Sequence, residues 1–206
     1  MKRLHFHLAR WRRDEAALAA YGLHWRAVDA LLADKSLALV GNARALAGAQ
    51  SGPDIDSHDL VMRVNAAPMP AAASHGRRCD LLALSIPVPA ARIAQLDPTV
   101  VLWMTRKRKR IPYHLASRAG FFLNPLTDWH PLADQLGAPP STGAMAIDLL
   151  ARSSVRQITL YGFDFFSSKS LSGGRDATQV PHDFAAEAGW VEDLLSRDGR
   201  FRLQAL

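Results

Sequence analysis

The chain has 206 residues, 49% of them hydrophobic, so it can bury one sizeable core and we expect a single domain. No apolar run approaches the ~20 residues of a transmembrane helix, so we expect no membrane span. The net charge of +6 suits anionic partners, namely nucleic acid, phosphorylated substrates or an anionic membrane surface, but does not choose among them.

Residues 1–35 are expected to form a helical segment that packs on the domain. Trp11, Tyr21 and Trp25 recur at roughly helical spacing among arginines and alanines, in one helix or in two with a break near Gly22. A basic amphipathic helix with tryptophans can also lie on a membrane surface. Packing is the commoner outcome, and a peripheral membrane contact stays open.

The main domain is expected to span residues 36–206 and to begin with a strand. Leu37–Val40 is a short apolar run, typical of a buried strand, and Gly41-Asn42 interrupts it before a helical stretch starts at Ala43. Such a turn leaves backbone N–H groups at the carboxyl edge of the sheet. That edge is where α/β proteins bind anionic, nucleotide-like ligands.

A second strand is expected over residues 59–65, and it ends on Asn65. Asn42 and Asn65 therefore stand at two predicted strand ends. An amide offers both donors and acceptors, as a nucleobase or ribose edge requires. Asparagine is equally an ordinary turn residue, and the spacing alone does not decide between the two interpretations.

The remaining chain alternates strands with helices, which predicts an α/β fold with a mostly parallel sheet. Residues 167–180 are polar and without periodicity, so we expect a loop there. Further strands are expected at 79–85, 99–104, 120–123, 156–161 and 201–203, and further helices at 90–96, 111–118, 129–136, 144–153 and 183–195.

Several other chemistries find little support. The histidines are scattered without metal-ligand spacing, and Asp54-Ile55-Asp56 is a weak D-x-D match. The glycines after Val40 form neither of the common NAD or ATP loops. The single cysteine, Cys79, excludes an intrachain disulfide, fits a reducing compartment and is expected to be a small residue near the core. The basic run 106–110 is expected to be a solvated loop or helix start.

A set of strand-end and helix-start groups remains. The hydroxyls of Ser141 and Thr142 can cap the helix that follows Gly143, and its first N–H groups can bind an anion. Gly162 follows another strand, and His182 precedes the last helix.

Three blocks of the sequence resemble the sialylmotifs of the sialyltransferases of glycosyltransferase family 29. The large motif has the form V-G-N, then G-x-x-I-D-x-H-D-x-V-x-R-x-N-x-A-P, and residues 40–42 and 52–68 supply it. Residues 140–143 and 160–163 are similar to the small motif, P-S-T-G and Y-G-F. His182 and Glu187 fit the very small motif, H-x-x-x-x-E.

The resemblance implies a single Rossmann-like domain of the GT-A-variant type and an inverting transferase. It would move sialic acid, or a related acidic sugar such as Kdo, from a CMP-sugar donor to a glycan hydroxyl without a metal or other cofactor. Its implied residues are Asn42 and Asn65 for the cytidine monophosphate, Ser141, Thr142, Gly143 and Gly162 for the donor, His182 as general base and Glu187 as support.

The chain departs from the animal members of the family. Ser36 and Leu37 stand where their first disulfide cysteine is expected, and no H-Y-Y-like motif is recognisable in 167–180. These departures fit a cytoplasmic, bacterial enzyme, with the inner membrane as a further option. The acceptor, whether lipid-linked or not, is not indicated, and we expect no nucleic acid partner.

Two other interpretations stay open. A catalytically silent CMP-binding protein would keep Asn42, Asn65 and the Ser141 helix start without depending on His182. A basic membrane- or nucleic-acid-surface protein on the same fold would depend on the run 106–110 and lose affinity steeply with salt.

Overall fold

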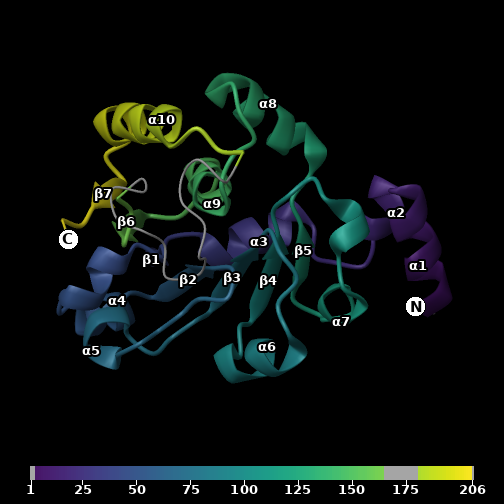
Figure 1. Cartoon of the computed structure of the whole chain (residues 1–206), viewed down its shortest axis with the longest axis horizontal. Coiled ribbons are helices and arrows are strands. Elements are labelled where there is room, and N and C mark those ends of the chain that lie inside the picture. The colour runs from purple at the N-terminus through teal and green to yellow at the C-terminus, as the bar shows by residue number, and fades with distance from the viewer. Residues whose placement is uncertain (1–2, 165–180, 206) are drawn as a thin grey trace.

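A computed structural model describes residues 3–164 and 181–205 of the chain. Their centre is a seven-stranded sheet of order β5-β4-β3-β2-β1-β6-β7, in which every neighbouring pair of strands is parallel (Figure 1). The predicted α/β class with a single, mostly parallel sheet is confirmed. The strands are β1 Ser36–Val40, β2 Leu60–Val64, β3 Leu81–Leu84, β4 Val100–Trp103, β5 Phe121–Leu123, β6 Gln157–Tyr161 and β7 Phe201–Leu203.

The central strands are short, nearly continuous apolar runs because both faces of the sheet are covered. All four residues of β3 and of β4 are buried, and only the first residue of β1, β2 and β6 is partly exposed. At the end of β1, Val40 is in register with Arg63 of β2 and Tyr161 of β6. The chain therefore leaves these three strands at the same level of one sheet edge.

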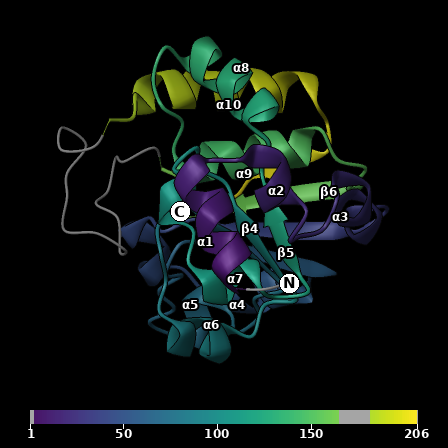
Figure 2. The ribbon, with the colours of Figure 1, turned by 90° about the vertical axis from the view of Figure 1, so that its right-hand side faces the viewer.

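Helices cover both faces of the sheet (Figures 1 and 2). One core cluster contains residues from all seven strands and from α3, α8, α9 and α10. A second contains residues from β3, β4 and β5 and from α1, α2, α6 and α7. The helical elements are α1 Arg3–Arg12, α2 Glu15–Ala19, α3 Trp25–Leu32, η1 Arg44–Gly48, α4 Gly52–Ser57, α5 Ala72–His75, α6 Ala90–Leu96, η2 Arg108–Arg110, α7 Tyr113–Ala116, α8 Leu126–Leu136, α9 Thr142–Ala151 and α10 Phe184–Arg197.

The N-terminal segment differs from the expected one or two helices, because it forms three. Arg13 has a positive φ of 56° and ends α1. At Gly22 a Cβ atom would lie 2.4 Å from the carbonyl oxygen of Phe121, and Leu23 bridges to β5. Phe6 of α1 and Leu18 of α2 are buried in the second core cluster.

Other boundaries also differ from the sequence-based expectations. The helix expected from Ala43 is the short 3₁₀ turn η1, and α4 and α5 were not anticipated because neither is long enough to show a period. The helix expected from Asp183 is confirmed, with the Asp183 carboxylate accepting a hydrogen bond from the Ala186 N–H at 2.9 Å. The loop expected at 167–180 lies outside the described residues.

Candidate active site

The site begins where the order of the strands reverses, between β1 and β6. The Gly41 N–H donates to the Tyr161 carbonyl at 2.7 Å, and the Ala43 N–H donates to the Gly162 carbonyl at 3.2 Å. A Cβ atom on Gly41 would lie 2.4 Å from the Gly162 oxygen, and Gly162 itself has a positive φ of 68°. Both positions therefore require glycine, and the two chain segments nearly touch at the point where open α/β sheets bind ligands.

A cavity of about 460 Å³ opens at this edge, within the usual size range of small-molecule sites. Its lining comes from the ends of β1, β2, β3, β4 and β6, from the start of α9 and from the start of α10. All the site residues expected from the sequence line this cavity: Asn42, Asn65, Ser141, Thr142, Gly143, Gly162, His182 and Glu187.

The two asparagines tie neighbouring segments together. Asn65 has a positive φ of 53°, accepts from the Ser85 N–H at 3.0 Å through Oδ1 and donates to Thr142 Oγ1 at 3.1 Å through Nδ2. Asn42 Nδ2 donates to the Val64 carbonyl at 3.3 Å. Asn65 thus links β3 to the start of α9. Because an amide has two donors and two lone pairs, these two contacts use half of the bonding capacity of Asn65.

The start of α9 is held from within the helix and from α10. Ser141 is the N-cap, and its Oγ accepts from the Ala144 N–H at 3.1 Å. A Cβ on Gly143 would lie 2.8 Å from the Phe163 ring, so a larger residue here would require that ring to shift. The start of a helix of this length favours an anion through its unpaired N–H groups and its dipole.

Glu187 of α10 makes the connection between the two helix starts. Its carboxylate accepts from the Ser141 N–H at 2.6 Å and from the Ser141 Oγ–H at 2.7 Å. The side chain is buried, and this burial raises the pKa of Glu187, while the hydrogen bonds from Ser141 act in the opposite direction. The geometry suits a residue that positions Ser141.

His182 lies just before α10, as its expected pairing with Glu187 requires. Its Nδ1 is 2.7 Å from the Pro139 carbonyl oxygen. Because a carbonyl can only accept, Nδ1 carries the hydrogen, and in the neutral imidazole Nε2 is then the acceptor nitrogen. In this tautomer Nε2 is the ring nitrogen that can accept a proton as a general base.

The cavity also has a basic end that the sequence analysis did not assign. Arg106, Lys107 and Arg110 follow β4 and line it with side chains that are exposed, as expected for a solvated run. Arg108 turns inward and pairs with Glu15. The run follows a predicted strand, as Asn42 and Asn65 do, so the same criterion would have indicated that the run borders the site.

The D-x-D segment has a structural role. The Asp56 carboxylate accepts from the backbone N–H groups of Arg77 and Arg78 at distances of 2.8 to 3.1 Å, and neither Asp54 nor Asp56 lines the cavity. Within 3–164 and 181–205, no group of three or more His, Cys, Asp or Glu side chains could hold a metal ion. The described helices include none long and apolar enough to cross a membrane.

Comparison with known proteins gives a similarity to one family over part of the chain and a shared fold over most of it. Residues 34–87 match the model of glycosyltransferase family 29 (sialyltransferase). A mammalian sialyltransferase, solved in complex with Gal-beta-1-3GalNAc-ortho-nitrophenol, aligns with a TM-score of 0.61 at 19% identity over 85% of this chain and 71% of its own. A second mammalian sialyltransferase structure aligns with a TM-score of 0.61 at 20% identity, over 83% and 69%.

A bacterial structure is also similar. The sialyltransferase CstII from Campylobacter jejuni, in complex with the substrate analogue CMP-3FNeuAc, aligns with a TM-score of 0.51 at 11% identity over 82% of this chain and 78% of its own. The sequence matches none of the curated proteins with which it was compared.

The fold and the strand-end cavity define the class first: a Rossmann-like α/β protein of the kind found in sialyltransferases. The match to the family model covers β1, β2, β3 and the segments between them, so this part of the chain is similar to the sialyltransferases of glycosyltransferase family 29.

Proposed function

We propose that this protein transfers sialic acid, or a related acidic sugar such as Kdo, from a CMP-sugar to a glycan hydroxyl, with inversion, without a metal and with His182 as general base. The observation that carries the proposal is the cavity itself. It gathers eight residues from three separate motifs at the point where the strand order reverses.

The donor is proposed to bind at the β1 and β6 end of the cavity. Asn42 and Asn65 supply amide groups for the cytidine, and the start of α9 supplies N–H groups for the phosphate or the sugar carboxylate. The complex of the similar Campylobacter enzyme with CMP-3FNeuAc supports a CMP-sugar as the donor. The complex of the mammalian enzyme with a disaccharide derivative supports a glycan as the acceptor.

The proposed chemistry is a single displacement. His182 Nε2 takes the proton of the acceptor hydroxyl while its oxygen bonds to the anomeric carbon, and the bond from that carbon to the CMP oxygen breaks on the opposite face. CMP leaves with the electron pair, through an oxocarbenium-like transition state. The helix-start N–H groups are suited to stabilising the leaving phosphate without a metal.

We also propose that α1 contacts an anionic membrane surface, with a cytoplasmic location at the inner membrane. Leu4, Leu8 and Trp11 follow at helical spacing on one face and are 81%, 43% and 69% exposed, while Phe6 and Ala9 are buried. An exposed apolar face with arginines around it suits anionic lipid headgroups. The exposed arginines of this segment are Arg3, Arg12 and Arg13.

The test is release of CMP from CMP-sialic acid and, separately, from CMP-Kdo, with and without sugar acceptors. We expect acceptor-dependent release from one donor, and stabilisation of roughly 2.7 kcal/mol at a CMP concentration a hundredfold above its dissociation constant. CMP binding without release would leave the catalytically silent interpretation. Neither binding nor release would contradict the proposal.

His182→Ala separates catalysis from binding. We expect loss of transfer with CMP affinity nearly unchanged, because Nε2 acts on the acceptor hydroxyl. His24→Ala is the matched control, since His24 is exposed and does not line the cavity. Transfer that survives in His182→Ala would place the base elsewhere.

A further inference from the structure

The end of the cavity beyond β4 is basic. Arg106, Lys107 and Arg110 line it with exposed side chains, and the Arg106 guanidinium lies 4.9 Å from the centre of the Trp129 ring, which lines the same cavity. Among the described residues, none of these three cations forms a salt bridge with a carboxylate. Their charges therefore face the cavity without an acidic partner in that part of the chain.

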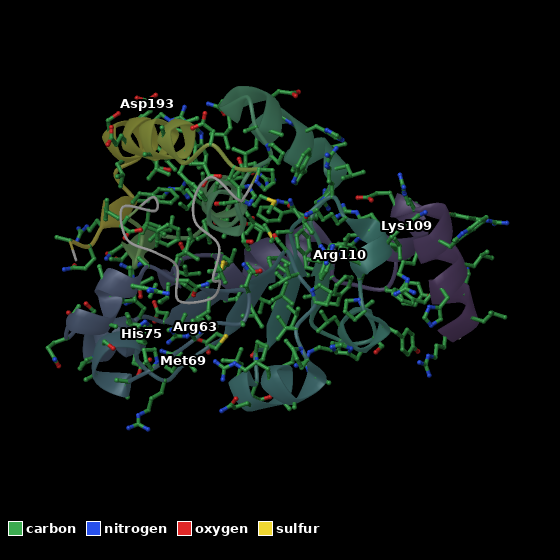
Figure 3. All side chains as sticks on the ribbon, in the orientation of Figure 1. Arg63, Met69, His75, Lys109, Arg110 and Asp193 are labelled. Atoms are coloured by element: carbon green, nitrogen blue, oxygen red, sulfur yellow. The ribbon has the colours of Figure 1, made fainter. Side chains whose placement is uncertain are left out.

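The turn that carries these cations is fixed from the inside. The buried Arg108 guanidinium donates to both carboxylate oxygens of Glu15, at 2.8 and 2.6 Å, and to the carbonyls of Thr105 and Asn124. Anchoring the middle of the run holds Lys107 and Arg110 beside the cavity. Figure 3 shows Lys109 on the side of α1 and α2, and Arg110 closer to the sheet.

The basic end is far from the proposed nucleotide site. Asn42 follows β1 and Arg106 follows β4, three strands away in the sheet, and neighbouring strands are about 4.8 Å apart, so the two ends are separated by about 14 Å. The proposed function assigns the cytidine and phosphate to the β1 and β6 end, which leaves the basic end of the same cavity for a second ligand.

We propose that Arg106, Lys107 and Arg110 bind the acceptor, and that this acceptor is an anionic carbohydrate bearing a carboxylate or a phosphate close to its reacting hydroxyl. This inference rests on the proposed function and adds the substrate class of its second site. Arginine binds carboxylate and phosphate in bidentate geometry, and lysine adds a point charge. A neutral acceptor would leave this end of the cavity without a counter-charge.

The test is sugar binding to the CMP-saturated protein, measured by calorimetry with lactose, 3′-sialyllactose and a lactose phosphate. We expect the two charged sugars to bind about tenfold or more tightly than lactose, because charge-assisted hydrogen bonds are each worth that much. The two charged sugars distinguish a terminal acidic sugar from a phosphosugar. The advantage should shrink at high salt because the cations are exposed.

Matched variants locate the effect. Lys107→Glu and Arg110→Glu should remove the advantage of the charged sugars and leave CMP affinity unchanged. Lys109→Glu is the control, since it makes the same charge change two residues from Lys107, at an exposed position that does not line the cavity. An equal loss in Lys109→Glu would reduce the effect to general charge and overturn the inference.

Other outcomes also decide it. Equal affinity for charged and neutral sugars would overturn the inference while leaving the proposed function intact. Loss of CMP affinity in Lys107→Glu or Arg110→Glu would assign these cations to the donor and overturn it as well. If CMP does not bind, the proposed function fails, and the same sugar comparison on the ligand-free protein still decides the inference.

Discussion

Removing the Glu187 carboxylate should disorganise the donor site without touching the substrate. Glu187 is 4% exposed and accepts two hydrogen bonds from Ser141, the residue that caps α9. Glu187→Ala leaves the Ser141 N–H unpaired in a partly buried position and opens a gap between the starts of α9 and α10. We expect lower stability together with weaker donor binding.

The magnitude follows from these contacts. Hydrogen bonds to a charged group contribute about 1.5–3 kcal/mol each, so two of them contribute about 3–6 kcal/mol. Removing a buried carboxylate also removes its desolvation penalty, which offsets part of that sum. The expected net loss is about 2–3 kcal/mol, or a melting temperature lower by about 5–10 °C for a chain of this length.

The assay is urea unfolding with and without CMP, with Glu192→Ala as the control. Glu192 lies on the same helix and is exposed, so its removal should change stability by less than about 0.5 kcal/mol. The dissociation constant for CMP should rise in Glu187→Ala and stay constant in Glu192→Ala. Equal stability of the two variants would refute the positioning role of Glu187.

Three further predictions follow from the same geometry. Burial raises the pKa of Glu187 above its ordinary 4.5. The stability of the wild type relative to Glu187→Gln should therefore be greatest below pH 4.5 and fall as the pH rises through the raised pKa. Denaturation series from pH 4 to 8 measure this difference. Gly41→Ala should lose about 1–3 kcal/mol and CMP binding, because its Cβ meets the Gly162 oxygen, whereas Gly48→Ala, with open space around it, should be neutral or slightly stabilising. Leu8→Glu should release the protein from phosphatidylglycerol vesicles in flotation assays. Leu31 on α3 is similarly exposed, and Leu31→Glu should not release it. Equal release by both variants would contradict a membrane contact through α1.

The sheet could be predicted from the sequence because its strands are buried on both faces. Leu37–Val40 and Val100–Trp103 are continuous apolar runs, and parallel order follows from their alternation with helices. The donor end of the site could be predicted for a related reason. Asn65 and Gly162 directly follow strands, Asn42 comes two residues after one, and the carboxyl ends of parallel strands share one edge.

The parts that could not be predicted depend on contacts between distant segments. Glu187 and Ser141 are 46 residues apart. No local sequence pattern indicates that the Glu187 carboxylate accepts hydrogen bonds from the N–H and the hydroxyl of Ser141. Arg106 and Arg108 are two residues apart in one basic run, yet one lines the cavity and the other is buried against Glu15. Hydrophobic periodicity carries no information about such choices, because all the residues concerned are polar.

The strand order relates the two proposals to each other. The cavity runs from Gly162 after β6, past Asn42 and Asn65, to Arg106 after β4, so its lining changes from amide and N–H groups to cations along one edge of the sheet. A transferase needs its nucleotide and its acceptor in line on either side of the reacting carbon. A cavity whose ends differ in chemistry meets that need. The proposed base, His182, lies neither with the amide and N–H groups nor with the cations. It belongs to the segment before α10, and its Nδ1 donates a hydrogen bond to the Pro139 carbonyl.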